Sequence, residues 1–428
     1  MNKDTIYDIA GIGVGPFNLG LAALCAPIEN VTSIFIEQKK EFNWHPGMMI
    51  PGTTLQVSYL ADLVTLADPS NKFSYLNFLR TQNRLIQFGI HESSYLTRSE
   101  YTRYCKWVAA QLPNLIFSTL VKTIFFDRKR DCFQIACTDD ITGLTKFIKA
   151  RHIIMGIGSQ LHLPGDLTIN GENIIHSSDY MHYRKMINAA GSVALIGSGQ
   201  SAAEIFYDQI HKRAGSSKRI DWYTQSDRFY AMERSKLAYE MSTPDYIDFF
   251  YQLPATKKKT LLGNQGTLYK GINEELINAI YDKLYHQYIE SQPIAAHLFT
   301  NTRLEQIKKI KDNTLSLEFC HLALDKKFSR PSDFAVFATG YDYRTPRFLS
   351  ALDHLIEYNC DKQFEVKRNY SVDNNNRIFV QNAELHTHGF NAADLGLGAY
   401  RNAVIINTIT KENIYPVDQH IAFQNFGL

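Results

Sequence analysis

Two short glycine-rich segments contain the residue types that bind the phosphates of dinucleotides. The first contains Gly11, Gly13, Gly15 and Pro16, and the second contains Gly197, Gly199, Gln200, Ser201 and Ala202. Glycine allows a tight bend and lets the backbone approach a pyrophosphate, while the N-terminus of the following helix offers free N–H groups and a partial positive charge. One such turn is weak evidence, because any tight strand–helix connection can use glycine. Two turns, half a chain apart, predict two dinucleotide sites.

A polar residue near the end of the next apolar stretch can select the dinucleotide. Glu37 follows the stretch 31–36, where a carboxylate can accept hydrogen bonds from ribose hydroxyls. A solvated charge is the alternative interpretation. The second segment has Thr224 at the corresponding place, and the missing acid favours NADPH. Ser226 and Arg228 are candidates for holding the 2′-phosphate, although Arg228 could equally be an ordinary surface charge.

Short apolar runs must form the elements that position these turns. We expect strands at 7–10, 31–36, 192–196 and 220–224, with helices at 19–24 and 203–207. Two more apolar runs, 152–155 and 334–337, are expected to return to the two sheets. Helical periodicity over 274–285 predicts a helical insertion spanning 237–288. The fold class is therefore α/β, with two Rossmann-like domains and a small helical insertion.

Composition excludes several classes of function. The chain has 428 residues, 45% of them hydrophobic, and a net charge of +2, which gives no reason to expect a nucleic-acid or membrane partner. None of the six cysteines forms a CxxC pair, so reduced thiols in a cytoplasmic protein are expected. The N-terminus lacks the basic head of a signal peptide, and no apolar run is long enough to span a bilayer.

Longer motifs add a family resemblance that covers nearly the whole chain. The stretches 11–24, 42–79, 197–204, 337–341 and 386–405 resemble the N-hydroxylating flavin monooxygenases of hydroxamate siderophore biosynthesis. That family hydroxylates the terminal amine of lysine, ornithine or simple diamines. The glycine motif that ends in Pro16 and the WHPGM block at 44–48 are specific to this group.

The resemblance implies the domain plan, the cofactors and the reaction. An FAD domain is expected at 1–165 and 345–428, an NADPH domain at 166–236 and 289–344, and a substrate-binding insertion at 237–288. The amine would be hydroxylated by O2 through a C4a-hydroperoxyflavin. The remaining flavin-site residues implied by the family are Trp44, His45, Gln56, Val121, Asp394 and Leu395, with 394–396 expected to start the last helix.

Departures from the family pattern predict the substrate. The ornithine-using branch has a lysine where this chain has Ala61, asparagines where it has Tyr239 and Leu268, and a serine where it has Gly396. Groups that would hold an amino acid's carboxylate and α-amine are thus missing together. An aliphatic diamine, putrescine or cadaverine, is therefore expected. Tyr239 and Glu240 are candidates for holding its distal ammonium.

Several alternatives stay open. Histamine also lacks a carboxylate, and lysine or ornithine would fit if another cation replaced the missing one. A flavin reductase is a more remote possibility. His386 and His388 could suggest a metal pair, but no metal is expected. A homo-oligomer, a tetramer by family analogy, is expected.

Overall fold

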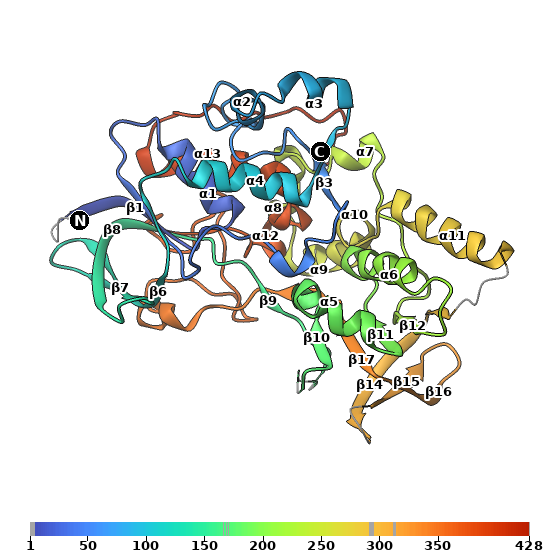
Figure 1. Ribbon diagram of the computed structural model, residues 1–428. Helices are drawn as coiled ribbons and strands as arrows, with labels where there is room; N and C mark the ends of the chain where they lie inside the picture. The colour runs from blue at the N-terminus through green and yellow to red at the C-terminus, as the bar shows by residue number, and fades with distance from the viewer. Residues whose placement is uncertain are drawn as a thin grey trace.

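The computed structural model describes residues 5–165, 167, 169, 171–290, 295–310 and 314–427. Two halves, each built on a sheet with parallel strands, lie next to each other, with helices packed around them (Figure 1). No helix within the described ranges has the length and apolar content needed to cross a bilayer. The α/β fold with two Rossmann-like halves is confirmed.

The first half contains a seven-stranded sheet in the order β5-β2-β1-β8-β7-β6, with β19 also paired to β8. Strands β5, β2, β1, β8 and β19 run parallel, whereas β6 and β7 form an antiparallel extension. The bounds are β1 Ile6–Ile12, β2 Ser33–Ile36, β5 Leu115–Ile116, β6 Thr119–Asp127, β7 Cys132–Asp139, β8 Thr145–Met155 and β19 Ile378–Val380.

Both faces of the parallel part of this sheet are buried, which explains the apolar runs in β1, β2 and β19. Helices α1 (Pro16–Cys25), α4 (Arg98–Ala109) and α13 (Gly398–Thr410) cover the face that contains Ile9 and Ile154. Leu349 and Leu352, in the 3-10 helix η3 (Arg347–Leu352), cover the face that contains Ala10. The remaining elements of this half are η1 Pro46–Met48, β3 Thr54–Ser58, α2 Tyr75–Thr81, α3 Leu85–His91, β4 Tyr95–Thr97, α12 Leu385–His388, η4 Phe390–Ala393 and η5 Leu395–Leu397.

The second half contains a five-stranded parallel sheet in the order β10-β17-β11-β12-β13. Its helices cover one face, and a three-stranded antiparallel sheet, β14-β15-β16, packs Leu315, Leu317 and Phe319 against the other. The bounds are β10 Ile174–His176, η2 Ser177–Asp179, α5 Tyr180–Ala189, β11 Ser192–Ile196, α6 Gln200–Lys212, β12 Arg219–Tyr223, β13 Ala296–Phe299, β14 Thr302–Lys309, β15 Leu315–His321, β16 Lys326–Ser332 and β17 Phe334–Phe337.

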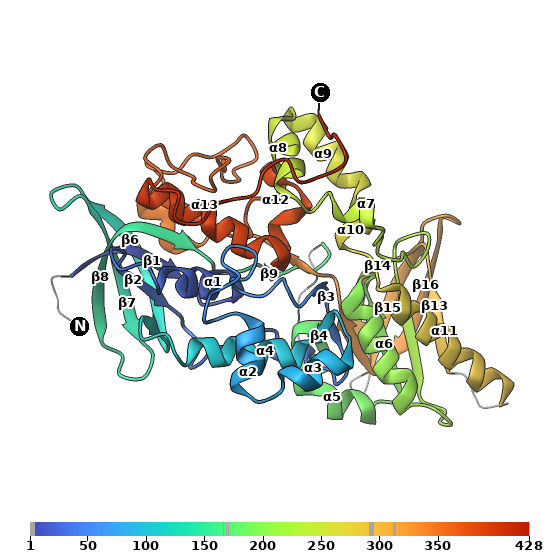
Figure 2. The ribbon, with the colours of Figure 1, turned by 90° about the horizontal axis from the view of Figure 1, so that it is seen from above.

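Among the described residues between β12 and β13 there are five helices, where the periodicity predicts a helical insertion. They are α7 Lys236–Tyr239, α8 Pro244–Gln252, α9 Ala255–Asn264, α10 Gly266–Tyr269 and α11 Glu274–Ile289. Figure 2 shows the C-terminal end of the chain beside α8 and α9.

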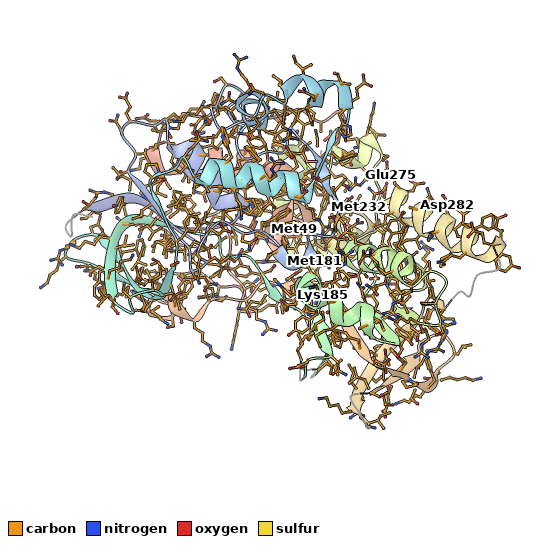
Figure 3. The ribbon with its side chains drawn as sticks, in the orientation of Figure 1. Met49, Met181, Lys185, Met232, Glu275 and Asp282 are labelled. Carbon is orange, nitrogen blue, oxygen red and sulfur yellow. The ribbon has the colours of Figure 1, made fainter. Side chains whose placement is uncertain are left out.

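The halves are joined both where the chain crosses between them and by apolar packing. The strands β9 (Gln160–Leu161) and β18 (Tyr341–Asp342) pair antiparallel where the chain crosses between the two sheets. Met48 and Ile50, from the first half, join the apolar core under α5, where Met181 also packs (Figure 3).

Candidate functional site

The two glycine turns have the same backbone design. Gly13 directly follows β1 and has φ +87°, and a Cβ there would lie 2.6 Å from the Gly156 carbonyl oxygen at the end of β8. Gly197 directly follows β11 with φ +145°, and a Cβ there would collide with the carbonyl of Ala338, just after β17. In each half, glycine therefore lets the turn pack on the end of the neighbouring strand.

Counted from Gly11, the first motif has Pro16 in place of its third glycine, but the structure shifts this frame by two residues. Gly15 and Gly199 are the N-caps of α1 and α6, so the pair Gly13 and Gly15 corresponds to Gly197 and Gly199. Gly11 lies inside β1, where a Cβ would collide with the ring of Phe35. Pro16 begins α1, as expected from its missing N–H, but it does not occupy the third position of the motif.

Asn18 occupies that third position, and sequence reasoning missed it. Its side chain is fully buried, and its Nδ2 donates to the carbonyls of Gly13 at 2.8 Å and Ile12 at 3.2 Å. Its Oδ1 accepts from Nε2 of Gln381, just beyond β19, at 2.8 Å. Asn18 therefore ties the glycine turn to the returning strand of the sheet. The "GPFN" context at 15–18 is the only local signal for it.

Glu37 is a buried carboxylate at the end of β2. It is 7% exposed, its Oε2 accepts from the Val14 N–H at 2.8 Å, and its Oε1 accepts from the Lys39 N–H at 2.9 Å. A solvated surface charge is therefore the wrong interpretation. Its place beside the first glycine turn fits the expected role on a ribose.

A polar network, which we call the junction network, joins the two halves near the second turn. Gln56, on β3, accepts at Oε1 from Nη2 of Arg234 and, at 3.4 Å, from Nδ2 of Asn273. The Asn273 N–H donates to Oε1 of Gln200 at 2.8 Å, and Gln200 Nε2 donates to Oε1 of Glu204 at 2.9 Å. Thus Gln56 and Gln200, both expected at cofactor sites, belong to one network.

The junction network contains two buried donors with nothing to bind. Within the described part of the chain, neither Gln56 Nε2 nor Arg234 Nε has a hydrogen-bond partner. Buried N–H groups are nearly always satisfied, so these two indicate a ligand rich in acceptors. Phosphate, ribose and flavin-ring oxygens meet that requirement. Arg234 was not predicted, because no motif contains it.

An ion pair completes the junction. Arg98, at the start of α4, contacts Glu204 on α6 with Nη1 to Oε2 at 2.8 Å, and their side chains are 14% and 3% exposed. Burial raises the pKa of Glu204, and the guanidinium of Arg98 opposes that shift.

Trp44 and His45 precede η1, with ring centroids 5.0 Å apart, and the His45 ring lies 5.9 Å from that of Tyr341.

The last helix begins slightly later than expected. Asp394, Leu395 and Gly396 form the cap and first turn of the 3-10 helix η5, and α13 starts only at Gly398. Asp394 Oδ1 accepts from the Gly396 N–H at 2.8 Å, and burial raises the pKa of this carboxyl.

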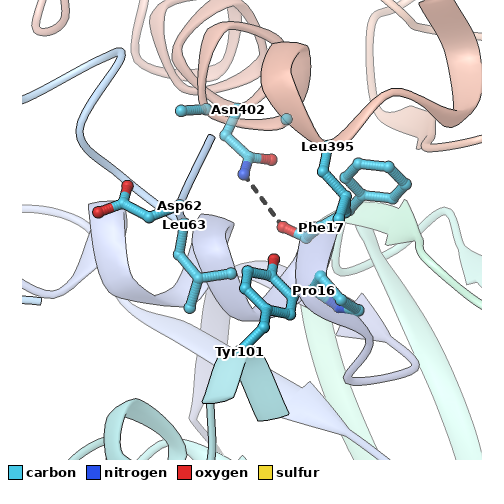
Figure 4. Close-up of a pocket in the computed structure, with 9 residues that line it drawn as sticks. Pro16, Phe17, Asp62, Leu63, Tyr101, Leu395 and Asn402 are labelled. Carbon is cyan, nitrogen blue, oxygen red and sulfur yellow. Dashed lines mark hydrogen bonds between the residues drawn. The ribbon is translucent and has the colours of Figure 1, made fainter. Parts of the chain in front are cut away.

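The starts of α1 and α13 face each other across a small cavity of about 10 Å³ (Figure 4). Leu395, Pro16 and Tyr101 line it, and Asn402 Nδ2 donates to the Phe17 carbonyl at 3.0 Å. The predicted residues of the first turn and of η5 are therefore brought together.

The predicted substrate residues come from four segments, one of which is η5 with Gly396. Ala61 is buried, and Tyr239 is half-exposed with its hydroxyl hydrogen-bonded to Tyr95. Leu268 packs in the apolar cluster of the insertion. Glu240 instead binds the C-terminal segment: its two carboxylate oxygens each accept a backbone N–H, from Phe423 and from Gln424, both at 2.9 Å.

Arg228, Ser226 and Val121 are further predicted cofactor residues. Arg228 is exposed and stacks over the Tyr230 ring at 4.5 Å. The Ser226 carbonyl accepts from the Asn301 N–H, and Val121 is buried in β6. His386 Nε2 lies 2.8 Å from the Phe364 carbonyl oxygen, whereas His388 stacks on Tyr370.

Two parallel-sheet halves, each with a glycine turn that feeds a helix, define an α/β protein with two dinucleotide-binding units. The chain matches the family of L-lysine 6-monooxygenases/L-ornithine 5-monooxygenases over residues 5–343, and it belongs to that family. This confirms the resemblance drawn from its motifs.

Individual relatives match over almost their full length. The chain is 42% identical to a putrescine N-hydroxylase of Shewanella oneidensis, covering 99% of this chain and 84% of the relative. It is 39% identical to a putrescine N-hydroxylase of Acinetobacter baumannii, covering 100% and 95%. The FAD-bound structure of DfoA, a cadaverine monooxygenase of Erwinia amylovora, is similar with a TM-score of 0.97 at 40% identity, covering 99% of each chain.

Proposed function

We propose that this protein uses FAD, NADPH and O2 to hydroxylate one nitrogen of an aliphatic diamine, putrescine or cadaverine, for hydroxamate siderophore biosynthesis. The observation that carries the proposal is the pairing of two matched glycine turns with a junction network that holds two unsatisfied buried donors. The relatives support the diamine, since two of them are putrescine N-hydroxylases and DfoA is a cadaverine monooxygenase.

The residues present fit both cofactors. FAD would be held by the first turn, Glu37, Trp44, His45, Gln56, Val121 and the segment 394–395. NADPH would be held by the second turn, Ser226 and Arg228. FAD reduced by NADPH would supply the electrons that activate O2, and O2 would supply the oxygen atom transferred to the amine. Arg234 and Gln56 would donate their free N–H groups to cofactor oxygens.

The chain must also present the amine in its neutral form. An alkylammonium has a pKa near ~10.4, so an environment that penalises charge has to favour loss of its proton. Asp394, the N-cap of η5, has a pKa that burial raises, and it is suited to hold that proton. Ala61 stands where the ornithine-using branch has a lysine, so the carboxylate of an amino acid would find no cation at that position.

Assembly and location belong to the same proposal. We infer a homo-oligomer, a tetramer by analogy with the family, acting in the cytoplasm. The six cysteines, all among the described residues, are free thiols, which supports a reducing compartment.

Product analysis tests the proposed function. The purified protein would be incubated with FAD, NADPH and O2, and hydroxylamine would be measured in parallel for putrescine, cadaverine, histamine, ornithine and lysine. We expect product mainly from a diamine. Product mainly from lysine or ornithine would contradict the diamine assignment, and NADPH oxidation without any hydroxylamine would favour a reductase.

A further inference from the structure

A cavity of about 320 Å³ lies in the helical insertion, beside the C-terminal segment. Its lining includes Glu233, Leu237, Met241, Gln265, Leu268 and Gln424. The Met241 carbonyl accepts from Nδ2 of Asn391 at 2.9 Å, which ties this wall to the segment that precedes Asp394. The cavity therefore lies next to the region where substrate residues are expected.

Gln265 presents a buried acceptor that nothing satisfies. The residue is 6% exposed, and its Nε2 donates to the hydroxyl of Tyr246. Its Oε1 has no donor anywhere in the described ranges. A buried carbonyl oxygen without a partner costs free energy, so this atom indicates a ligand that brings an N–H or O–H donor.

The charge of the lining specifies the kind of donor. Glu233 is the charged residue among the ten that line the cavity, all of which are described, and the polar remainder consists of neutral amides and hydroxyls. Leu237, Met241 and Leu268 add an apolar surface. One carboxylate, amide oxygens and an apolar wall match an ammonium group on a methylene chain.

The C-terminal segment 420–427 lies along one side of this cavity, to which it contributes Gln424. Besides its bonds to Glu240, the segment donates the N–H groups of His420 and Ile421 to the Asp245 carboxylate, each at 2.9 Å. Gln424 Nε2 donates to the Leu237 carbonyl at 2.6 Å. Two carboxylates of the insertion thus hold the segment so that Gln424 forms one wall.

We propose that this cavity binds the ammonium at the end of the diamine that is not oxidised, with Gln265 Oε1 accepting its hydrogen bond and Glu233 supplying the opposite charge. This assignment rests on the proposed function and names the residues that distinguish a diamine from a monoamine. Glu240 then acts indirectly, by positioning Gln424.

The test compares a diamine with a monoamine. Gln265→Met removes the acceptor at similar volume, and Gln287→Met, at another buried glutamine far from the cavity on α11, is the matched control. Affinity for 1,4-diaminobutane would be measured by calorimetry, and hydroxylation of 1,4-diaminobutane and n-butylamine by product analysis. We expect Gln265→Met to weaken diamine affinity about ten- to hundred-fold, as for a hydrogen bond to a charged group, and to leave n-butylamine turnover and flavin reduction by NADPH unchanged.

Two further variants keep the test decisive. Glu233→Gln should also weaken diamine affinity, because it removes the negative charge. Gln265→Glu should keep the wild-type affinity or tighten it, because it retains an acceptor and adds a negative charge. Wild-type diamine affinity in both Gln265→Met and Glu233→Gln, or an equal loss for n-butylamine, would overturn the assignment. Failure of the proposed function looks different: the diamine would bind in a Gln265-dependent way, yet no amine would yield hydroxylamine.

Discussion

At the level of single residues, the site depends on buried polar side chains that form hydrogen bonds with the backbone of the first glycine turn. Asn18 bonds two carbonyls of the first turn, and Glu37 bonds the Val14 N–H of the same turn. These contacts fix the turn's shape, so the turn needs little rearrangement when a pyrophosphate binds.

Glu37 should control FAD affinity. Replacing Glu37 by Gln removes the charge that would accept from ribose hydroxyls, and hydrogen bonds to charged groups contribute about 1.5–3 kcal/mol. We therefore expect the Kd for FAD, measured by flavin fluorescence, to rise about ten-fold or more. Glu41→Gln is the control, because the Glu41 side chain is 66% exposed and pairs with Lys106. An unchanged Kd in Glu37→Gln would remove Glu37 from the FAD site.

His388 should make stability fall in mild acid. Burial, together with the charges of Arg368 and Arg401, holds its pKa well below 6.5. Below that pH the unfolded chain binds a proton that the folded chain does not, so the free energy of unfolding falls as the pH falls, by up to about 1.4 kcal/mol per unit.

The pH effect can be isolated by its slope. Urea unfolding between pH 7.5 and 5.5 should show a shallower pH dependence in His388→Asn than in the wild type. His354→Asn, at an exposed histidine, should keep the wild-type slope. Parallel curves for all three proteins would show that His388 is protonated equally in both states.

At the level of elements, the sequence was informative wherever a pattern is local. Strands β1, β11 and β17 were predictable because buried parallel strands are short apolar runs. The frame of the first turn was not predictable, because a string of glycines does not show which one turns the chain. Gly11 is needed for another reason, since a Cβ there would collide with the ring of Phe35. The contacts of Gln56 with Arg234 and Asn273 join distant parts of the chain that no motif links.

The second glycine turn gives a prediction for its half of the molecule. Gly197→Ala would place a Cβ against the Ala338 carbonyl at a φ of +145°, so the turn must move. We expect a loss of about 1–3 kcal/mol of stability and weaker NADP⁺ binding, with FAD content retained. Gly263→Ala, on α9 with open space around it, should be neutral or slightly stabilising. Thermal unfolding and NADP⁺ titration measure both effects, and equal NADP⁺ affinity in the two variants would contradict the assignment.

The C-terminal segment gives a second prediction at this level. The N–H groups of Phe423 and Gln424 lower the pKa of Glu240, so docking of the segment is stabilised above the ordinary carboxyl pKa and lost as the pH falls through the lower, folded value. Glu240→Gln should therefore speed hydrogen exchange across 420–427 at neutral pH, measured by mass spectrometry. Glu412→Gln, at an exposed residue before the segment, should not. Unchanged exchange in Glu240→Gln would show that the carboxylate does not hold the segment.

At the level of the whole molecule, a flavin and a nicotinamide bound to different halves can react only if the halves keep a fixed relation. The junction places polar contacts beside the second glycine turn. Within it, Arg98 and Glu204 form a nearly buried pair from opposite halves. Such a pair is sensitive to geometry, because its charges have lost water and depend on each other.

Breaking that pair should therefore affect stability and hydride transfer together. Glu204→Gln leaves Arg98 buried without its counter-charge, and we expect a loss of about 3 kcal/mol and slower reduction of bound FAD by NADPH in stopped flow. Arg98→Met should do the same, whereas the double variant should lose less than the sum of the two. Arg84→Met, which breaks a pair whose arginine is 40% exposed, should change neither measurement appreciably. A coupling energy below about 0.5 kcal/mol between Arg98 and Glu204 would mean that other contacts hold the two halves in register.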